Sequence, residues 1–177
     1  MSQWIAGISR GHNASVCLLK DGEIVYSIEE ERLSRKKYDG GPYASMIKIL
    51  EYTDKIDYLV IAHTQPDDSN VDFRGGSVYT GLANKIGLIE REDQVLDLHK
   101  WHHKLHAACA FYRSGFEDAV AVIVDGAGTF IPLVLGNQSV GSSPNEDVMS
   151  WELETIFKCN YPDEFKTLYK HQGPPSY

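Results

Sequence analysis

The sequence predicts an α/β fold made of two successive sheet units, and three patterns support this prediction. Three short β-rich runs open the chain, an amphipathic segment and a continuous apolar run follow them, and a strand–glycine turn–strand pattern recurs after residue 115. Strands that alternate with helices are typical of α/β proteins. The 177 residues, 42% of them hydrophobic, suffice for one ordinary globular domain with a core.

The net charge of the chain indicates which classes of binding partner are expected. The formal net charge is −8, and Arg35–Lys37 is the densest basic run, which argues against electrostatic binding to nucleic acid or to an anionic membrane. Small molecules or other proteins are the expected partners. Cys17, Cys109 and Cys159 have no Cys-x-x-Cys spacing, so we expect buried, reduced thiols in a cytoplasmic protein. No signal peptide is expected, and no apolar run approaches the roughly 18–20 residues that span a bilayer.

The chain opens as a predicted antiparallel meander. The runs Trp4–Ser9, Ser15–Lys20 and Glu23–Glu29 are rich in apolar and β-branched residues, and Asp21-Gly22 is a strong hairpin signal between the last two. Between the first two lies the polar turn Arg10–Asn13. Its glycine lets backbone N–H groups face an anion, although an ordinary hairpin loop would have the same sequence features.

A charge-dense connection follows the meander and leads into a helix and a strand. Residues 29–42 suit either a solvated surface or the handling of a charged substrate. Apolar spacing predicts a helix over Tyr43–Thr53, and the continuous apolar run Ile56–Ala62 predicts a buried strand covered on both faces. Residues 65–87 are expected to form a long loop with one short helix at Tyr79–Lys85.

Three histidines mark the next helix. We expect it to run from His102 to Ser114 and to end at Gly115. Residues four apart lie on the same face of a helix, so His102 and His106 are expected to lie together. They are expected at the edge of an apolar arc formed by Leu105, Ala108, Cys109 and Tyr112. His103 is expected to turn toward solvent.

The second unit is expected to repeat the opening pattern. Its predicted elements are a strand at Ala119–Val124, the acidic glycine turn Asp125–Thr129, a strand at Phe130–Leu135, a flexible hairpin tip over 136–147, a strand at Met149–Lys158 and a helix from Pro162-Asp163. The repetition suggests a duplicated unit whose second copy is unfinished. A truncated chain, or a partner polypeptide that supplies the missing half, would account for it.

The histidine spacing predicts a metal site. Two neutral imidazoles at i and i+4, together with Asp125 at the end of a strand, suit a divalent transition metal. His99 and His103 have the same spacing and rank second. The competing interpretation is that these histidines lie on the surface or contact phosphate. The sequence contains no zincin, nucleophile-elbow, Walker A or dinucleotide fingerprint.

Several of these segments together resemble a known family. The amino-terminal part of the O-carbamoyltransferases of the nodulation and antibiotic-tailoring type is similar to this chain in four motifs, in the same order: Gly7–Ser15, Glu29–Lys37, His102–Ala108 and Val124–Gly128. Tyr161–Tyr169 also resembles the family's sequence.

The resemblance implies a fold and a reaction. It implies an actin-like ATPase fold of two ribonuclease-H-like halves, similar to the tRNA threonylcarbamoyl-adenosine transferase. Residues 1–115 would be a complete first half with the metal-binding helix, and residues 116–177 the start of a truncated second half. It also implies a metal, often iron, at the nucleotide cleft, and transfer of a carbamoyl group to an acceptor hydroxyl. The donor is carbamoyl adenylate, which a separate domain makes from carbamoyl phosphate and ATP.

Carried over by position, the resemblance assigns roles to individual residues. It makes His102, His106 and Asp125 metal ligands. It matches His12 to the histidine of the first glycine loop, a candidate catalytic residue that would orient the carbamoyl group or accept the hydroxyl proton.

The cofactor would be held by glycine-loop backbone and by cations. Loop N–H groups would hold the anion, and two basic side chains would meet phosphate or carbamoyl oxygens, with solvated surface as the competing interpretation for the latter. The residues concerned are Gly11, Asn13, Gly126 and Gly128 for the loops, and Arg32 and Lys37 for the cations.

The family's further aspartate ligand and its adenylate-forming domain have no counterpart in these 177 residues. We therefore expect a partial carbamoyltransferase that needs a missing portion in trans. The alternatives are a non-catalytic nucleotide- or metal-binding module of the same fold, and a metal-dependent hydrolase.

Overall fold

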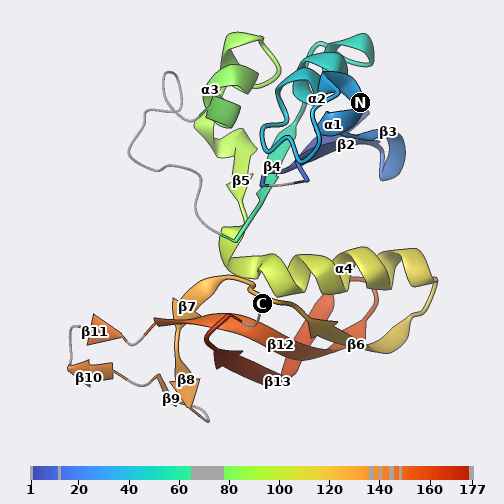
Figure 1. Ribbon diagram of the computed structural model, residues 1–177. Coiled ribbons are helices and arrows are strands. Elements are labelled where there is room, and N and C mark those ends of the chain that lie inside the picture. The colour runs from blue at the N-terminus through green and yellow to red at the C-terminus, as the bar shows by residue number, and fades with distance from the viewer. Residues whose placement is uncertain are drawn as a thin grey trace. The chain divides into compact units, whose positions relative to one another are not determined.

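The structure is a computed structural model. It describes residues 2–11, 13–64, 78–135, 138–139, 141–143, 146–147 and 149–175. The chain divides into two compact units, Met1–His99 and Lys100–Tyr177, called here the first and the second unit. Figure 1 shows the elements of each.

The first unit contains the predicted meander. Strands β1 (Trp4–Ser9), β2 (Ser15–Lys20) and β3 (Glu23–Glu29) pair antiparallel in chain order. Strands β4 (Tyr58–Ala62) and β5 (Val95–Asp97) add to the sheet in parallel, so the order in the described part is β3-β2-β1-β4-β5. Asp21 and Gly22 both have positive φ, 52° and 86°, as a type I′ hairpin turn requires.

The helices of the first unit are short. They are α1 (Glu30–Ser34), α2 (Tyr43–Ile47), the 3₁₀ turns η1 (Lys48–Glu51) and η2 (Glu92–Gln94), and α3 (Val78–Lys85). The predicted helix over residues 43–53 is thus one α-turn continued by a 3₁₀ turn, and α3 matches the predicted short helix. The loop expected before α3 lies largely outside the described residues.

Alternating residues of the first sheet form a core. Ala6, Ile8, Val16, Leu18, Leu59 and Ile61 are buried, and Met46, Ile49 and Ala83 of the helical segments pack in the same cluster. Since alternate strand residues point to one face, the helices cover that face. The expectation that β4 is covered on both faces is wrong, because its burial pattern alternates and Tyr58 is 39% exposed.

A buried carboxylate joins α1 to α2. Glu30 is 3% exposed. Its Oε1 accepts a hydrogen bond from the Ala44 N–H at 2.9 Å, and its Oε2 accepts from the N–H and the hydroxyl of Ser45 at 2.9 and 2.6 Å. These bonds satisfy otherwise unpaired N–H groups at the start of α2.

The second unit packs one helix on one sheet (Figure 1). Helix α4 (His102–Ser114) follows the 3₁₀ turn η3 (His99–Trp101) and ends at Gly115, whose φ is 76°, as predicted. The sheet contains β6 (Asp118–Val124), β12 (Met149–Asn160) and β13 (Glu164–Gly173), and β7 (Phe130–Pro132) pairs with the first residues of β12. The short pairs are β8 (Val134–Leu135) with β9 (Gln138–Ser139) and β10 (Gly141–Ser143) with β11 (Glu146–Asp147).

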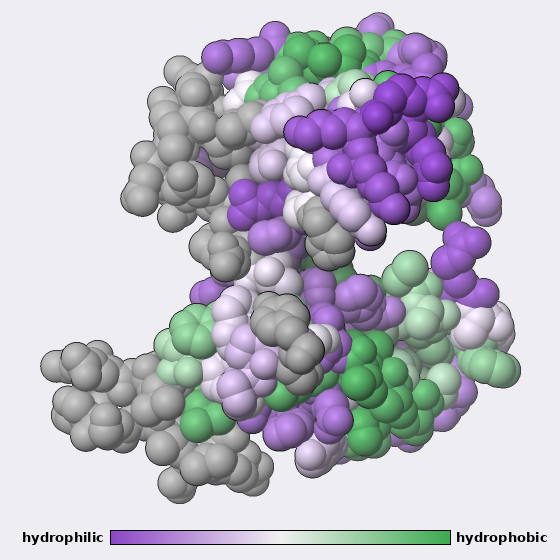
Figure 2. Space-filling model, in the orientation of Figure 1, coloured by the Kyte–Doolittle hydropathy of each residue, from purple (hydrophilic) through white to green (hydrophobic). Residues whose placement is uncertain are grey.

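The two faces of this sheet differ. Ala107 and Phe111 of α4 are buried against Phe157 and Cys159 of β12, with alanines and Ile123 of β6 alongside. On the other face of β6, Val120, Val122 and Val124 are 61%, 62% and 74% exposed. Figure 2 shows apolar residues at the surface of this unit.

Two predictions for the second unit are wrong. The segment after Pro162 is the strand β13 and not a helix: it pairs with β12 over most of its length, and Phe165 packs against Phe111 at 5.7 Å between ring centroids. The strands expected for the second meander are also wrong, because β7 pairs with the first residues of β12 and β13 is the third strand; the antiparallel order of the opening, β3-β2-β1, nevertheless recurs as β13-β12-β6.

Helix α4 belongs with the second unit. The sequence analysis assigned it to residues 1–115, whereas in the structure it packs on β6 and β12. Of the three cysteines, Cys159 is buried, Cys17 is half-buried and Cys109 is exposed, so the expectation of burial is wrong for Cys109. No helix in the described ranges is long and apolar enough to cross a membrane.

We predict that Glu30→Ala destabilises the first unit by about 2–3 kcal/mol, because it leaves three donors at the start of α2 without their acceptor. Glu30→Gln should lose about half as much, since its amide oxygen still accepts. Urea denaturation followed by Trp4 fluorescence, with Trp101 and Trp151 replaced by Phe, measures this. The exposed Glu23 provides the matched control, and an equal loss in Glu23→Ala would contradict the assignment.

Candidate metal centre

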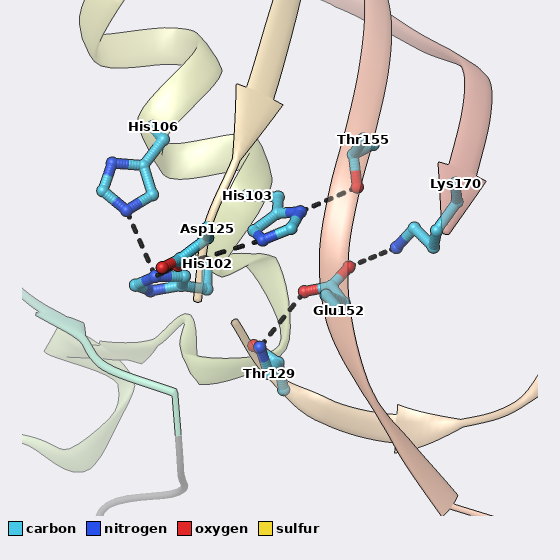
Figure 3. A network of polar contacts seen from close by, with 8 residues as sticks. All are labelled: His102, His103, His106, Asp125, Thr129, Glu152, Thr155 and Lys170. Atoms are coloured by element: carbon cyan, nitrogen blue, oxygen red, sulfur yellow. Dashed lines mark hydrogen bonds and ion pairs between the residues drawn. The ribbon is translucent and has the colours of Figure 1, made fainter. Parts of the chain in front are cut away.

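The three side chains predicted as metal ligands lie together in the second unit (Figure 3). His102 and His106 occupy successive turns of α4, and Asp125 directly follows β6. His102 Nε2 lies 2.9 Å from Asp125 Oδ2 and 3.1 Å from His106 Nε2. One ligand atom of each residue lies within 4.8 Å of the others.

The loop after β6 holds Asp125 in place. The backbone N–H groups of Gly126 and Ala127 hydrogen-bond to the Asp125 carboxylate, and the Asp125 N–H donates to the Leu153 carbonyl at 2.8 Å. Burial by itself raises the pKa of Asp125. The hydrogen bond and charge interaction with His102, together with the two backbone bonds, outweigh burial and hold the pKa below its usual value. Asp125 is therefore ionised at neutral pH.

The donor set fits a divalent transition metal. Two imidazole nitrogens and a carboxylate oxygen are ligands that such ions accept. Ligands about 2.0–2.2 Å from one ion are roughly 3.0–3.5 Å from each other at tetrahedral or octahedral angles. The separations of 2.9 and 3.1 Å are close to that range. The presence of a metal stays a prediction.

The face of α4 that packs on the sheet differs from the expected one. His103, Ala107 and Phe111 are buried, whereas Cys109 and Tyr112 of the predicted apolar arc are exposed. The expectation that His103 faces solvent is wrong, because its position is set by Ala107 and Phe111 at i+4 and i+8.

The two histidines of the second-ranked pair, His99 and His103, each contact another residue. His103 Nδ1 lies 2.7 Å from the hydroxyl of Thr155, and His99 contacts Asp97 at 3.1 Å.

A polar network lies behind the three ligands (Figure 3). Glu152 is 2% exposed and pairs with Lys170. The Thr129 N–H donates to its carboxylate at 3.3 Å, and the Gly128 N–H donates to the Glu152 carbonyl at 2.8 Å. The loop 125–129 is thus fastened to β12.

The sequence analysis missed these supporting residues. Thr155, Phe157 and Cys159 alternate along β12 and are all buried, so a polar residue in an inward-facing position was the available signal for Thr155. Glu152 lies beside an irregularity in the strand pairing, where simple alternation does not place a residue.

The two glycines assigned to cofactor binding in this loop bind protein groups. The Gly126 N–H meets the Asp125 carboxylate, and the Gly128 N–H meets β12. These contacts position the loop, and cofactor binding by the two glycines stays a prediction.

The remaining predicted site residues belong to the first unit. Gly11 has a φ of 115°, and its N–H donates to the Gly40 carbonyl at 3.2 Å. Asn13 is exposed in the same turn, and His12 lies outside the described residues.

The two predicted cations are exposed. Arg32, 67% exposed, lies 3.5 Å from Glu29 and 3.6 Å from Glu31. The Lys37 ammonium lies 4.9 Å from the centre of the Tyr38 ring. These contacts favour the solvated-surface interpretation of both side chains.

We predict that the purified protein binds one divalent transition metal and that His106→Ala loses it, because two of three ligands cannot hold the ion. Elemental analysis after loading and desalting measures this. His99→Ala is the control, since His99 belongs to the second-ranked pair and should keep full metal content. Equal metal content in wild type and His106→Ala would exclude the site.

The histidines also predict a pH dependence without metal. Burial, followed by the charge of His102, lowers the pKa of His106, and burial is the largest cause of the lowered pKa of His103. Between about pH 6.5 and the lower pKa values of the folded chain, the unfolded chain therefore binds more protons than the folded chain. The free energy of unfolding decreases as pH falls through this range. The melting temperature in EDTA should decrease from about pH 7.5 to 5.5, and less steeply in His106→Ala. A flat wild-type profile would contradict the prediction.

Comparison with known proteins gives a relationship at the level of sequence. No known protein-family model matches the chain. The chain is 28% identical to Nodulation protein NolNO of Sinorhizobium fredii, over 89% of this chain and 27% of that protein. It is 32% identical to an uncharacterized protein of Methanocaldococcus jannaschii, over 70% of this chain and 22% of that protein.

An uncharacterized protein of Synechocystis sp. is 25% identical, over 93% of this chain and 30% of that protein. The chain thus spans between 22% and 30% of the length of these curated relatives. The similarity to a nodulation protein covers most of the chain, at low identity. It supports the relationship to O-carbamoyltransferases that the four motifs predict.

Proposed function

We propose that the chain is the metal-binding part of an O-carbamoyltransferase, which moves a carbamoyl group from carbamoyl adenylate to an acceptor hydroxyl. One observation carries the proposal. His102, His106 and Asp125, which the family resemblance makes metal ligands, converge in the structure. Similarity to NolNO over 89% of the chain supports the same relationship.

The chemistry of the three side chains suits this role. A divalent transition metal bound there, with iron as the expected ion, would offset negative charge on the phosphate and on departing AMP. Asp125 is kept ionised by His102 and the loop N–H groups, and burial favours the neutral form of His106. Asp125 and His106 therefore have the protonation states that metal ligands need near neutral pH.

The acceptor hydroxyl must lose a proton during transfer. We assign this proton to His12, which belongs to the turn between β1 and β2. Next to His12, Gly11 adopts a positive φ, and its N–H bonds to the Gly40 carbonyl in the segment before α2. Gly11 and Asn13, the sequence neighbours of His12, would hold the anion of the cofactor through the loop. The surface contacts of Arg32 and Lys37 give them no part in it.

Synthesis of carbamoyl adenylate lies outside the proposed role. Because the chain spans less than a third of its curated relatives, we propose that a further polypeptide segment makes the adenylate and binds the acceptor. The substrate requirement of the complete enzyme would then be carbamoyl phosphate, ATP and a hydroxyl compound.

A chimera tests this division of labour. We predict that NolNO whose matching segment is replaced by this chain releases pyrophosphate from ATP and transfers labelled carbamoyl to its acceptor. Asp125→Ala in the chimera should keep pyrophosphate release and lose transfer by at least about 100-fold, because only the second step needs the ligand.

The control variant is His171→Ala, which changes a half-exposed histidine of β13 and should keep both steps. Equal transfer by the chimera and its Asp125→Ala variant would rule out the proposal. Metal and nucleotide binding without transfer would instead identify a non-catalytic module, and metal-dependent hydrolysis without nucleotide would identify a hydrolase.

A further inference from the structure

We propose that His103 is a positioning residue that orients the carboxylate of Asp125 toward a bound metal. This inference rests on the metal-binding part of the proposed function. It assigns His103 neither as a ligand nor as a group that touches substrate. His103 would act through its Nε2 atom, on the side of the ring that faces Asp125.

Of the two ring nitrogens of His103, one makes a hydrogen bond to a described residue. The side chain is 1% exposed, and its Nδ1 lies 2.7 Å from the hydroxyl of Thr155, which is fully buried. Its Nε2 is also buried and makes no hydrogen bond to any described residue. A buried ring nitrogen without a partner is rare in native proteins and calls for a specific explanation.

Among the described residues, Asp125 has a charged oxygen within 4.0 Å of His103 Nε2. His103 Nε2 lies 3.9 Å from Asp125 Oδ2, and the same oxygen lies 2.9 Å from His102 Nε2. A distance of 3.9 Å is too long for a hydrogen bond, but a movement of about 1 Å by the carboxylate would form one. Figure 3 shows Asp125 between the two imidazoles.

Metal binding supplies the reason for that movement. The Nε2 atom of His102 cannot coordinate an ion and also donate a hydrogen bond to Asp125, because both uses need the same position on the ring. Once His102 is a ligand, Asp125 Oδ2 loses its present donor. Beside the backbone N–H groups of Gly126 and Ala127, His103 Nε2 is then a side-chain donor close to one carboxylate oxygen while the other oxygen faces the ion.

Thr155 selects the tautomer that this role requires. If the Thr155 hydroxyl donates to Nδ1, the ring proton resides on Nε2 and points toward Asp125. The Thr155 hydroxyl makes no other hydrogen bond to a described residue, and Thr155 is fully buried on the inward face of β12. With the carboxylate moved toward the ring, Thr155, His103 and Asp125 would form a directed chain of two hydrogen bonds, of which the structure shows the first.

Gly128 keeps the imidazole in this position. A Cβ atom at residue 128 would lie 2.6 Å from His103 Nε2 and 2.9 Å from its Cδ2. The ring edge thus packs directly on loop backbone, and Glu152 Cβ lies 3.0 Å from the same point. This contact blocks displacement of the ring toward the loop.

The test measures Co²⁺ affinity by competition with a chromophoric chelator, together with the visible absorption of bound Co²⁺. We expect His103→Phe to weaken affinity by about 10–100-fold and to alter the spectrum. His103→Gln should recover part of the loss, because its amide N–H can donate near the position of Nε2. Thr155→Val should weaken affinity by several-fold, whereas Thr155→Ser keeps the hydroxyl and should bind as wild type.

Phe111→Leu is the matched control, because Phe111 lies on the same buried face of α4 and lacks a polar contact to Asp125. It should lower the melting temperature and leave Co²⁺ affinity within about twofold. If His103→Phe fails to fold, the Thr155 pair and His103→Gln decide the question.

Two results would overturn the inference and leave the proposed metal site intact. The first is that His103→Phe and Thr155→Val bind Co²⁺ with the affinity and the spectrum of the wild type. The second is that Co²⁺ affinity falls in proportion to melting temperature across all variants, Phe111→Leu included. Failure of the wild-type protein itself to bind Co²⁺ would overturn both the inference and the metal-binding part of the proposed function.

Discussion

The backbone of β12 is the constraint on which the candidate site depends. Its register against β6 ends at Glu154 opposite Val124, and its next carbonyl, that of Leu153, accepts the hydrogen bond from Asp125. Glu152 then exchanges backbone bonds with Gly128 and Thr129. The loop therefore continues the pairing of the sheet after β6 itself has ended. A carboxylate held this way loses little further entropy when it takes up a ligand.

The buried carboxylate of Glu152 also fixes the loop after β6 to the sheet. Glu152 is enclosed, and its carboxylate is satisfied by Lys170 and by the Thr129 N–H. Removing one partner of such a pair is costly, because the other charge stays buried, although the intact pair adds little net stability. The contribution of this pair is to fix geometry. Three segments, namely β13, β12 and the loop after β6, meet at a single side chain.

Local signals in the sequence predicted the elements well, and non-local contacts account for the errors. Asp21-Gly22 and Gly115 act within a few residues, so the hairpin and the end of α4 were predictable. The spacing of His102 and His106 is also local. His103, in contrast, is buried because Thr155, 52 residues away, offers it a partner. The helix signal at Pro162 is overridden because β12 supplies a strand to pair with. The convergence of the candidate ligands was thus predictable, whereas the contacts that support them required the fold.

The exposed valines of β6 affect how readily the chain associates with other chains. Val120, Val122 and Val124 leave one face of an edge strand apolar and open. Strand edges of this kind associate with other extended chains, and chaperones and proteases act on proteins that display them. The net charge of −8 opposes self-association. Burial of these three side chains against another surface would therefore remove apolar area from water and reduce association with other extended chains.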